Sequence, residues 1–252
     1  MNNEKILKNT LALYIRQVIL IVITLYSIRV VLNELGTDDY GLYSVITGFV
    51  TLLAFLPGSM ASATQRFFSY AMGKNDEIQL KQTFSVNLIM YCCIAAIAYM
   101  ALQSLGLWYV IEQLKIPEDR FDAVVGLYHY AALSFVFSIF TAPFIAILIA
   151  HEDMHLYAMI SVLDAVLKLV AAISLACIDI DLLVYYGMAL FIISALIACI
   201  YILVCIRKYA ECQLRRLYWN AQLIKEILGF TVWTLLGQIS TVFRIQAVTI
   251  LV

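Results

Sequence analysis

Five basic side chains lie within stretches of this sequence that are otherwise apolar enough to cross a membrane. They are Arg16, Arg29, Arg66, Lys168 and Arg244. A charged side chain near the bilayer centre costs at least ~2.5–3.5 kcal/mol on insertion scales, so such residues usually face a bundle interior or a water-filled cavity. Because few acidic residues lie at matching depths, the pattern predicts a cavity that binds an anion.

The residue types indicate which anion such a cavity would bind. Guanidinium groups bind phosphate through two parallel hydrogen bonds and stay charged even in a dry site. An anionic lipid headgroup or a diphosphate therefore fits, whereas a cationic drug would be repelled, and a cation channel would carry acidic rings instead. Gln65 precedes Arg66 in the polar stretch 59–66 and favours a lined cavity there, although the small residues of that stretch also suit close helix packing.

The same cations also have a simpler interpretation. Long basic side chains can reach the headgroups from within the membrane, and Arg16 and Arg66 each lie only roughly 9 Å from an end of their segments. Asp164 lies four residues before Lys168, one helical turn away, so these two charges can neutralise each other. Arg244 has no acidic neighbour in its segment and is the hardest to explain in this way.

The elements that must position these residues are membrane-spanning helices. The chain is 64% hydrophobic and 13% charged, with a mean hydropathy of +0.93, against about 45–50% and about 25% in soluble domains. Since about 20 apolar residues span a bilayer, the sequence predicts an all-α polytopic membrane helix bundle with about seven transmembrane helices. The expected segments are 10–32, 40–72, 84–108, 121–150, 156–178, 182–206 and 229–252.

Three local signals predict interruptions in these helices. Leu35-Gly36-Thr37 fits a helix stop followed by an N-cap. Pro57 predicts a kink in a segment that is too long for one straight crossing. Pro143 lies about two turns before the end of the fourth segment, where it serves either helix packing or a hinge.

The distribution of basic residues predicts the orientation and the domains. With a cytoplasmic N-terminus, nine basic residues fall in inner loops and two, Lys115 and Arg120, in outer loops, which the positive-inside rule strongly favours. The inner ones are Lys5, Lys8, Lys74, Lys81, Arg207, Lys208, Arg215, Arg216 and Lys225. We therefore expect an N-terminal transmembrane lobe of about six helices (1–206), a cytoplasmic interfacial linker (207–228) and a seventh transmembrane helix (229–252). The apolar end of that helix indicates the first part of a longer protein.

Nothing in the sequence has the pattern of an enzyme or of a metal site. The six cysteines form no C-x-x-C pair. His151 and His155 flank two acidic residues in a short loop but form no H-E-x-x-H motif. We expect no catalytic residue, no metal, no cofactor and no nucleic-acid partner, and the sequence identifies no coupling ion.

Several motifs are similar to those of a known superfamily. They are SIRVVLNELG at 27–36, DYGLY at 39–43, GSM at 58–60, TQRF at 64–67 and AHEDM at 150–154. The chain resembles the polysaccharide flippases, of O-antigen and capsule type, in the multidrug/oligosaccharidyl-lipid/polysaccharide (MOP) exporter superfamily. The resemblance spans essentially the whole chain, and its most specific part is the run from about 27 to 75.

The resemblance implies a fold, a substrate and a location. Such proteins have two pseudo-symmetric lobes around a central cavity, and this chain would form the N-terminal lobe of a MATE-like flippase. They flip an undecaprenyl-diphosphate-linked oligosaccharide across the bacterial inner membrane by alternating access, with a possible glycan polymerase or ligase complex as partner. Arg16, Arg66 and Arg244 are the positions that match their cavity arginines most naturally. Gln65, from the polar stretch, and Lys168, from the intramembrane cations, are added as candidate binding residues on their positions in the sequence.

Other functions remain open at this point. A cation-coupled multidrug antiporter on the same scaffold would need acidic cavity residues, for which Asp164 is the one good intramembrane candidate. A membrane glycan polymerase or ligase would need a large outer loop, whereas the outer loops expected here are short. A scaffold that organises glycan assembly without transport is a third possibility.

Overall fold

The structure, a computed structural model, describes residues 3–74, 76–114, 116–178, 181–212 and 218–251. Within these ranges the side chains of 3–6, 239 and 241–251 are not described. The main helices are α1 (Asn3–Thr51), α2 (Phe55–Gly73), α3 (Glu77–Ala101), α4 (Leu107–Glu112), α5 (Phe121–Ala150), α6 (Met154–Ser174), α7 (Leu182–Lys208) and α8 (Ala221–Leu251). The described residues contain no strand, so the predicted all-α membrane bundle is confirmed.

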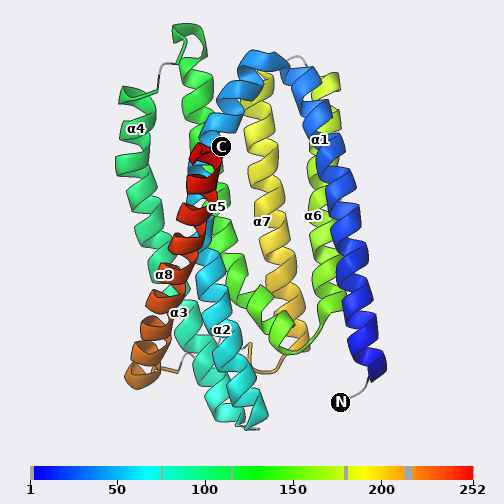
Figure 1. Cartoon of the computed structure of the whole chain (residues 1–252), viewed down its shortest axis with the longest axis vertical. Coiled ribbons are helices and arrows are strands. Elements are labelled where there is room, and N and C mark those ends of the chain that lie inside the picture. Colours follow the sequence, from blue (N-terminus) through cyan, green and yellow to red (C-terminus); the bar gives the residue numbers. More distant parts are fainter. Residues whose placement is uncertain (1–2, 75, 115, 179–180, 213–217, 252) are drawn as a thin grey trace.

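The helices run between two ends of an elongated bundle (Figure 1). One end, here called the N-terminal end, carries the start of α1 and the α2–α3, α5–α6 and α7–α8 connections. The opposite end carries a bend within α1 and the α4–α5 and α6–α7 connections. The connections that the sequence predicted to be basic therefore lie together at the N-terminal end.

The described helices cross a membrane-sized distance repeatedly. Five stretches are long and apolar enough to span, the first being Leu7–Gly73 with 67 residues. At 1.5 Å per residue a straight helix of that length would measure about 100 Å, roughly three times the apolar thickness of a bilayer. The stretch Leu7–Gly73 is therefore long enough to cross the membrane twice. Each of the first six predicted segments corresponds to a helix or helix pair of the structure. Helix α8 begins at Ala221, inside the range 207–228 that the sequence indicated as a linker.

The bend that divides α1 lies at Gly36, where the sequence predicted a helix stop. Gly36 has φ 77° and ψ 175° and interrupts the helical conformation. A positive φ is readily adopted by glycine because it has no Cβ. The break separates a first segment of α1 (3–35) from a second segment (37–51), and the chain turns over at the opposite end of the bundle (Figure 1).

The two prolines of the sequence analysis behave differently. A 3-10 turn, Leu52–Ala54, separates the α-helical conformation of α1 from that of α2, and Pro57 follows in the first turn of α2. The interruption lies in the second predicted segment, as expected from Pro57. In the first turn of a helix the backbone N–H groups have no partner within the helix, so a proline there removes no helical hydrogen bond. Pro143 lies buried within a continuous α5.

The bundle is organised around α5, which packs against α1, α2, α3 and α7. Fully buried residues of α5, such as Leu127, Ile139 and Ile147, form the centre of the core. The first segment of α1, in contrast, packs mainly on α6 at the edge of the bundle (Figure 1) and exposes Leu11, Val18 and other apolar side chains. Such exposure suits a surface in contact with lipid or with another membrane helix.

Polar clusters join the helix ends at both faces of the bundle. At the opposite end, Arg120 donates hydrogen bonds to Asp39 of α1 and, at 2.8 Å, to Asp181, which caps α7. At the N-terminal end, Asp153 forms an ion pair with Lys208 at 3.0 Å and accepts a hydrogen bond from Tyr209. These contacts fix the ends of α1, α5, α6 and α7 relative to one another.

Candidate functional site

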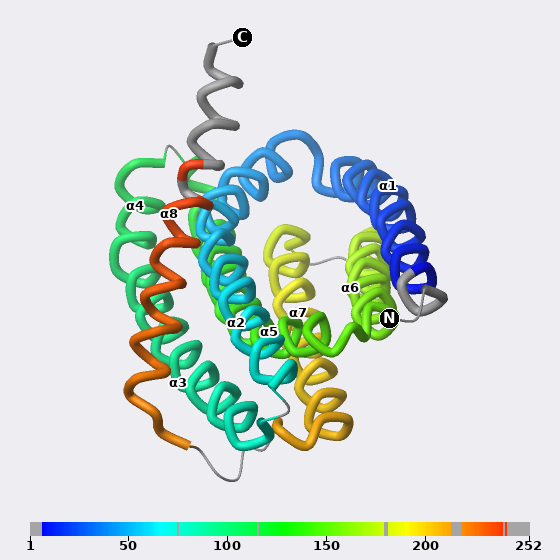
Figure 2. Tube along the Cα trace, turned by 60° about the horizontal axis from the view of Figure 1, so that its bottom comes forward, coloured from blue at the N-terminus to red at the C-terminus, as the bar shows by residue number. Residues whose placement is uncertain are grey.

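A cavity of about 810 Å³ lies inside the ring formed by both segments of α1 and by α5, α6 and α7. Figure 2 shows these helices arranged around the centre of the lobe. The volume is in the range of about 300–1,000 Å³ that is typical of small-ligand sites. The cavity is therefore the best candidate for a binding site in the described part of the chain.

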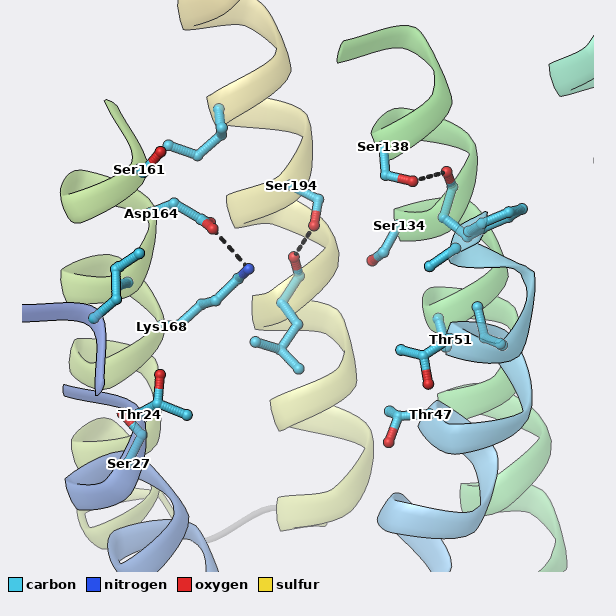
Figure 3. A pocket seen from close by; sticks show the side chains of 18 of the residues that line it. Thr24, Ser27, Thr47, Thr51, Ser134, Ser138, Ser161, Asp164, Lys168 and Ser194 are labelled. Atoms are coloured by element: carbon cyan, nitrogen blue, oxygen red, sulfur yellow. Dashed lines mark hydrogen bonds and ion pairs between the residues drawn. The ribbon is translucent and has the colours of Figure 1, made fainter. Parts of the chain in front are cut away.

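Hydroxyl groups dominate the polar lining of this cavity, and Figure 3 shows most of them. The serines and threonines are Thr24, Ser27, Thr47, Thr51, Ser134, Ser138, Thr141, Ser161 and Ser194. Five tyrosines join them: Tyr40, Tyr43, Tyr157, Tyr186 and Tyr201. A lining of this composition can hydrogen-bond a polar ligand within an otherwise apolar bundle.

Arg16 is a cation of the cavity that forms no ion pair with a described residue. Its guanidinium carbon lies 4.6 Å from the centre of the Tyr157 ring. Its Nε atom is buried, and no described group accepts a hydrogen bond from it. Arg16 therefore brings to the cavity lining a positive charge that no described carboxylate neutralises.

The other two charges of the cavity pair with each other. Lys168 Nζ donates to Asp164 Oδ2 over 2.8 Å along one turn of α6 (Figure 3), as their spacing in the sequence allowed. Their side chains keep 42% and 30% of their exposure, so a ligand in the cavity can reach both. With Arg16 uncompensated, the three described charges of the lining sum to +1.

The five binding residues that the sequence suggested do not all lie together. Arg16 and Lys168 share the cavity. Arg66 is exposed on α2, with its guanidinium 4.3 Å from the centre of the Phe230 ring of α8, and Gln65 beside it is half-buried; neither lines the cavity. The side chain of Arg244 lies outside the described residues.

The polar stretch 59–66 serves mainly helix packing. Thr64 is fully buried, donates to Asn87 Oδ1 at 2.7 Å and lies 3.1 Å from the hydroxyl of Tyr91. Ser59 and Ala63 are also fully buried. The small residues therefore let α2 approach its neighbours closely.

The hydroxyl lining was missed in the sequence analysis, although a signal for it exists. Ser134, Ser138 and Thr141 recur at spacings of four and three residues along α5, and Thr47 and Thr51 are four apart in α1. Residues at these spacings lie on one face of a helix. A polar face on an otherwise apolar membrane helix would have predicted that α5 and the second segment of α1 line a cavity.

Comparison with known proteins gives a fold but no family. No protein-family model matches the sequence, and no curated protein matches it. Among solved structures, an outward-facing multidrug resistance MATE family transporter of the MOP superfamily matches with a TM-score of 0.80 at 14% identity, over 96% of this chain and 54% of that one. A MOP superfamily transporter from Pyrococcus furiosus matches with a TM-score of 0.79 at 12% identity, over the same shares.

An inward-facing MATE family transporter also matches, with a TM-score of 0.70 at 15% identity, over 90% of this chain and 54% of that chain. The chain spans about half the length of these solved structures. At such identities the likeness establishes the fold alone. The protein has the architecture of one half of a MATE-like membrane helix bundle.

Proposed function

We propose that this protein translocates an undecaprenyl-diphosphate-linked oligosaccharide from the cytoplasmic to the periplasmic leaflet of a bacterial inner membrane. In this proposal the chain is one lobe of a transporter that works by alternating access, with its N-terminus in the cytoplasm. Rocking of two lobes about a shared site is the usual means of such transport. The single observation that supports the anionic substrate best is the unpaired guanidinium of Arg16 in the cavity.

The charge of the cavity favours an anion over a cation. Asp164 is the one acidic side chain among the described lining residues, and it is already paired with Lys168. A cationic drug would therefore meet a net positive site. For the Pyrococcus furiosus transporter, reverse polarity of the binding pocket suggests a different function, and the polarity of this cavity is likewise our reason to prefer a diphosphate.

In the proposed site Arg16 binds the diphosphate from the cytoplasmic side. Tyr157, whose ring lies under the guanidinium, belongs to the first turn of α6 at the N-terminal end. Lys168 lies eleven residues further along α6, roughly 16 Å deeper. Arg66, Gln65 and Arg244 stay proposed binding residues, which would act where this lobe meets its counterpart.

A multidrug antiporter on the same scaffold is the second candidate. It is favoured by the MATE family transporters among the similar structures. In that case Asp164, rather than Arg16, would be the essential charge of the cavity.

Complementation tests the proposal. The protein in its natural full length would be expressed in cells that lack their own flippase, and glycan display would be measured for wild type, Arg16→Ala and Arg207→Ala at equal membrane levels. Arg207 is an exposed basic residue in the last turn of α7 and serves as the matched control. Because hydrogen bonds to charged groups contribute about 1.5–3 kcal/mol, Arg16→Ala should reduce display by about tenfold to hundredfold.

Full display by Arg16→Ala would overturn the proposed role of Arg16. Failure of wild type to restore display, together with Asp164-dependent resistance to cationic drugs, would establish the antiporter instead.

A further inference from the structure

The connection between α7 and α8 is attached to the α5–α6 loop at the N-terminal end of the lobe, away from the cavity. The Nε2 atom of His151 in the loop lies 2.5 Å from a carboxylate oxygen of Glu211 in the connection. The ring of His151 also stacks on that of Tyr209, with ring centres 4.2 Å apart. Asp153 of the loop accepts a hydrogen bond from Tyr209 and pairs with Lys208 at 3.0 Å. We call these five residues the latch.

The latch and its surroundings are largely shielded from water. The side chains of His151 and Glu211 keep 22% and 11% of their exposure. Cys212, one residue after Glu211, is buried in an apolar cluster with Ile147 and Leu148 of α5. Since release of the connection from the loop would expose this thiol, Cys212 reports whether the latch is closed.

The α5–α6 loop also holds the start of α1. Asn9 donates to the backbone oxygen of Glu152 at 3.0 Å, and Glu152 lies between His151 and Asp153 in the sequence. The loop thus contacts both the α7–α8 connection and the helix that carries Arg16. A change in the latch would therefore reach α1 as well.

The charged and titratable groups around the His151–Glu211 pair come from four elements. They are Glu152 and Asp153 of the loop, Cys205 and Lys208 of α7, Tyr209, Glu211 and Cys212 of the connection, and Lys81 of α3.

Among the groups of the latch, His151 is the one suited to respond near neutral pH. Burial would raise the pKa of the carboxyls of Asp153 and Glu211, but hydrogen bonds from their latch partners hold both below their ordinary values. Burial raises the pKa of the Tyr209 hydroxyl above its ordinary value. The two carboxyls therefore stay ionised and the phenol stays neutral at such pH. Histidine is the side chain whose charge ordinarily changes between about pH 5 and 8.

We propose that the α7–α8 connection is docked on the α5–α6 loop by a proton-operated latch, which is closed while His151 is protonated and opens as His151 loses its proton. A hydrogen bond from an imidazolium to a carboxylate is charge-assisted and roughly twice as strong as a neutral one. The histidine thus contributes its extra stabilisation while it is protonated, and this contribution is lost as the pH rises. In the orientation that we propose, this end faces the cytoplasm, so an alkaline cytoplasm would release the connection and loosen the start of α1.

The test measures how fast N-ethylmaleimide labels Cys212 in the purified full-length protein, read by mass spectrometry of the peptide that carries it. At each pH, the rate in SDS divided by the rate in the native protein gives a protection factor, which cancels the effect of pH on the thiol itself. The variants are His151→Gln, which keeps a donor without a charge, and His155→Gln. His155 is exposed in the first turn of α6, four residues after His151, and serves as the matched control.

We expect the protection factor of Cys212 in wild type and in His155→Gln to fall by about fivefold to tenfold from pH 6 to pH 8, because a neutral donor replaces a cationic one. In His151→Gln the protection factor should be low already at pH 6 and change little. Cys205, which is fully buried within α7, should stay protected in all three proteins, which shows that the lobe is folded.

Two results for Cys212 would overturn the latch. One is a protection factor in wild type that does not change with pH, and the other is an equal fall in His151→Gln, since another group would then be the sensor. Loss of protection at Cys205 together with Cys212 would show unfolding of the lobe rather than release of the connection, and would overturn the proposal too. None of these results depends on which substrate the protein transports.

Discussion

At the scale of single residues, the two cations of the cavity, Arg16 and Lys168, differ in whether an acidic side chain neutralises them. Lys168 has an acidic partner one helical turn away, whereas Arg16 contacts a tyrosine ring and keeps an unpartnered Nε. The partner of Lys168 could be read from the sequence, because i and i+4 residues always share a helix face. The unpartnered state of Arg16 could not, because it depends on how α1 packs on α6.

This difference gives a prediction for Asp164→Asn. Removal of the carboxylate raises the formal charge of the lining from +1 to +2 and frees Lys168, so an anion should bind more tightly. At an effective dielectric constant of about 20, even a distant charge contributes about 1 kcal/mol, which corresponds to about fivefold in affinity. Binding of undecaprenyl diphosphate to the purified protein measures this, with the exposed Asp38→Asn as control. An antiporter would instead lose its transport in Asp164→Asn, and unchanged or weaker lipid binding would contradict our assignment.

At the scale of elements, Gly106 marks a close approach between two helices. The stretch Leu102–Gly106 forms a π-helical turn between α3 and α4, and Tyr128 of α5 donates to Leu102 O at 2.6 Å. A Cβ at position 106 would lie 2.1 Å from the hydroxyl oxygen of Tyr128. The turn and the tyrosine therefore fit only with glycine at this position.

We predict that Gly106→Ala lowers stability by about 1–3 kcal/mol, as overpacking of a core typically does. Thermal unfolding of the purified protein measures the change. In Gly106→Ala/Tyr128→Phe the clashing oxygen is absent, so the double variant should be more stable than the sum of the two single effects implies. Strict additivity would show that the contact with Tyr128 is not the cause.

The cluster at the N-terminal end predicts a dependence on pH. Burial alone would raise the pKa of Asp153, but hydrogen bonds from Tyr209 and Lys208 hold it below its ordinary value of 3.8. Burial likewise would raise the pKa of Glu211, but the hydrogen bond from His151, at 2.5 Å, holds it below 4.5. Since both carboxyls have a lower pKa in the folded state, their contribution to stability is complete above these ordinary values and is lost as the pH falls from them through the lower pKa values of the folded state.

The measurement is the thermal midpoint of unfolding between pH 7 and pH 3. Wild type should lose stability below about pH 4.5. Asp153→Asn/Glu211→Gln should start from a lower midpoint and change less over that interval. A parallel decline in both proteins would contradict the assignment to these two groups.

The positions of the elements were largely predictable, whereas their lining faces were not. The length of each apolar stretch predicts a membrane-spanning helix, because about 20 apolar residues are needed to cross a bilayer, and Gly36 predicts the main bend. The side of each helix that lines the cavity could not be predicted in this way. The exposed side of α6 or α7 is as apolar as the side that faces a neighbouring helix, so hydrophobic periodicity carries little information there. Only the spacing of hydroxyls, such as Ser134 and Ser138, marks the cavity side.

At the scale of the whole molecule, the opposite end of the lobe is held by Arg120, which bridges Asp39 and Asp181. In Arg120→Ala these two carboxylates would face each other without a cation. We expect a loss of about 1–2 kcal/mol, since the side chains are 18–37% exposed and water screens part of the interaction. The thermal midpoint measures it, and Arg207→Ala, which removes an exposed cation, should leave it unchanged.

The last prediction concerns the orientation of the lobe, which we infer from the end that carries the basic residues. The α2–α3 connection lies at the N-terminal end, and the α4–α5 connection lies at the opposite end (Figure 1). Lys74 and Glu118 are exposed in these two connections and outside the helices α2 and α5. In a background without the six natural cysteines, Lys74→Cys and Glu118→Cys would each place one thiol at a known end.

A thiol reagent that does not cross membranes would then be applied to intact spheroplasts and to lysed cells. Because basic loops stay on the cytoplasmic side, the thiol of Lys74→Cys should react only after lysis, and that of Glu118→Cys before it. The reverse pattern would place Arg16 at the outer face, where it could not receive a substrate made in the cytoplasm. It would therefore contradict the direction of transport that we propose, while leaving the fold and the cavity as they are.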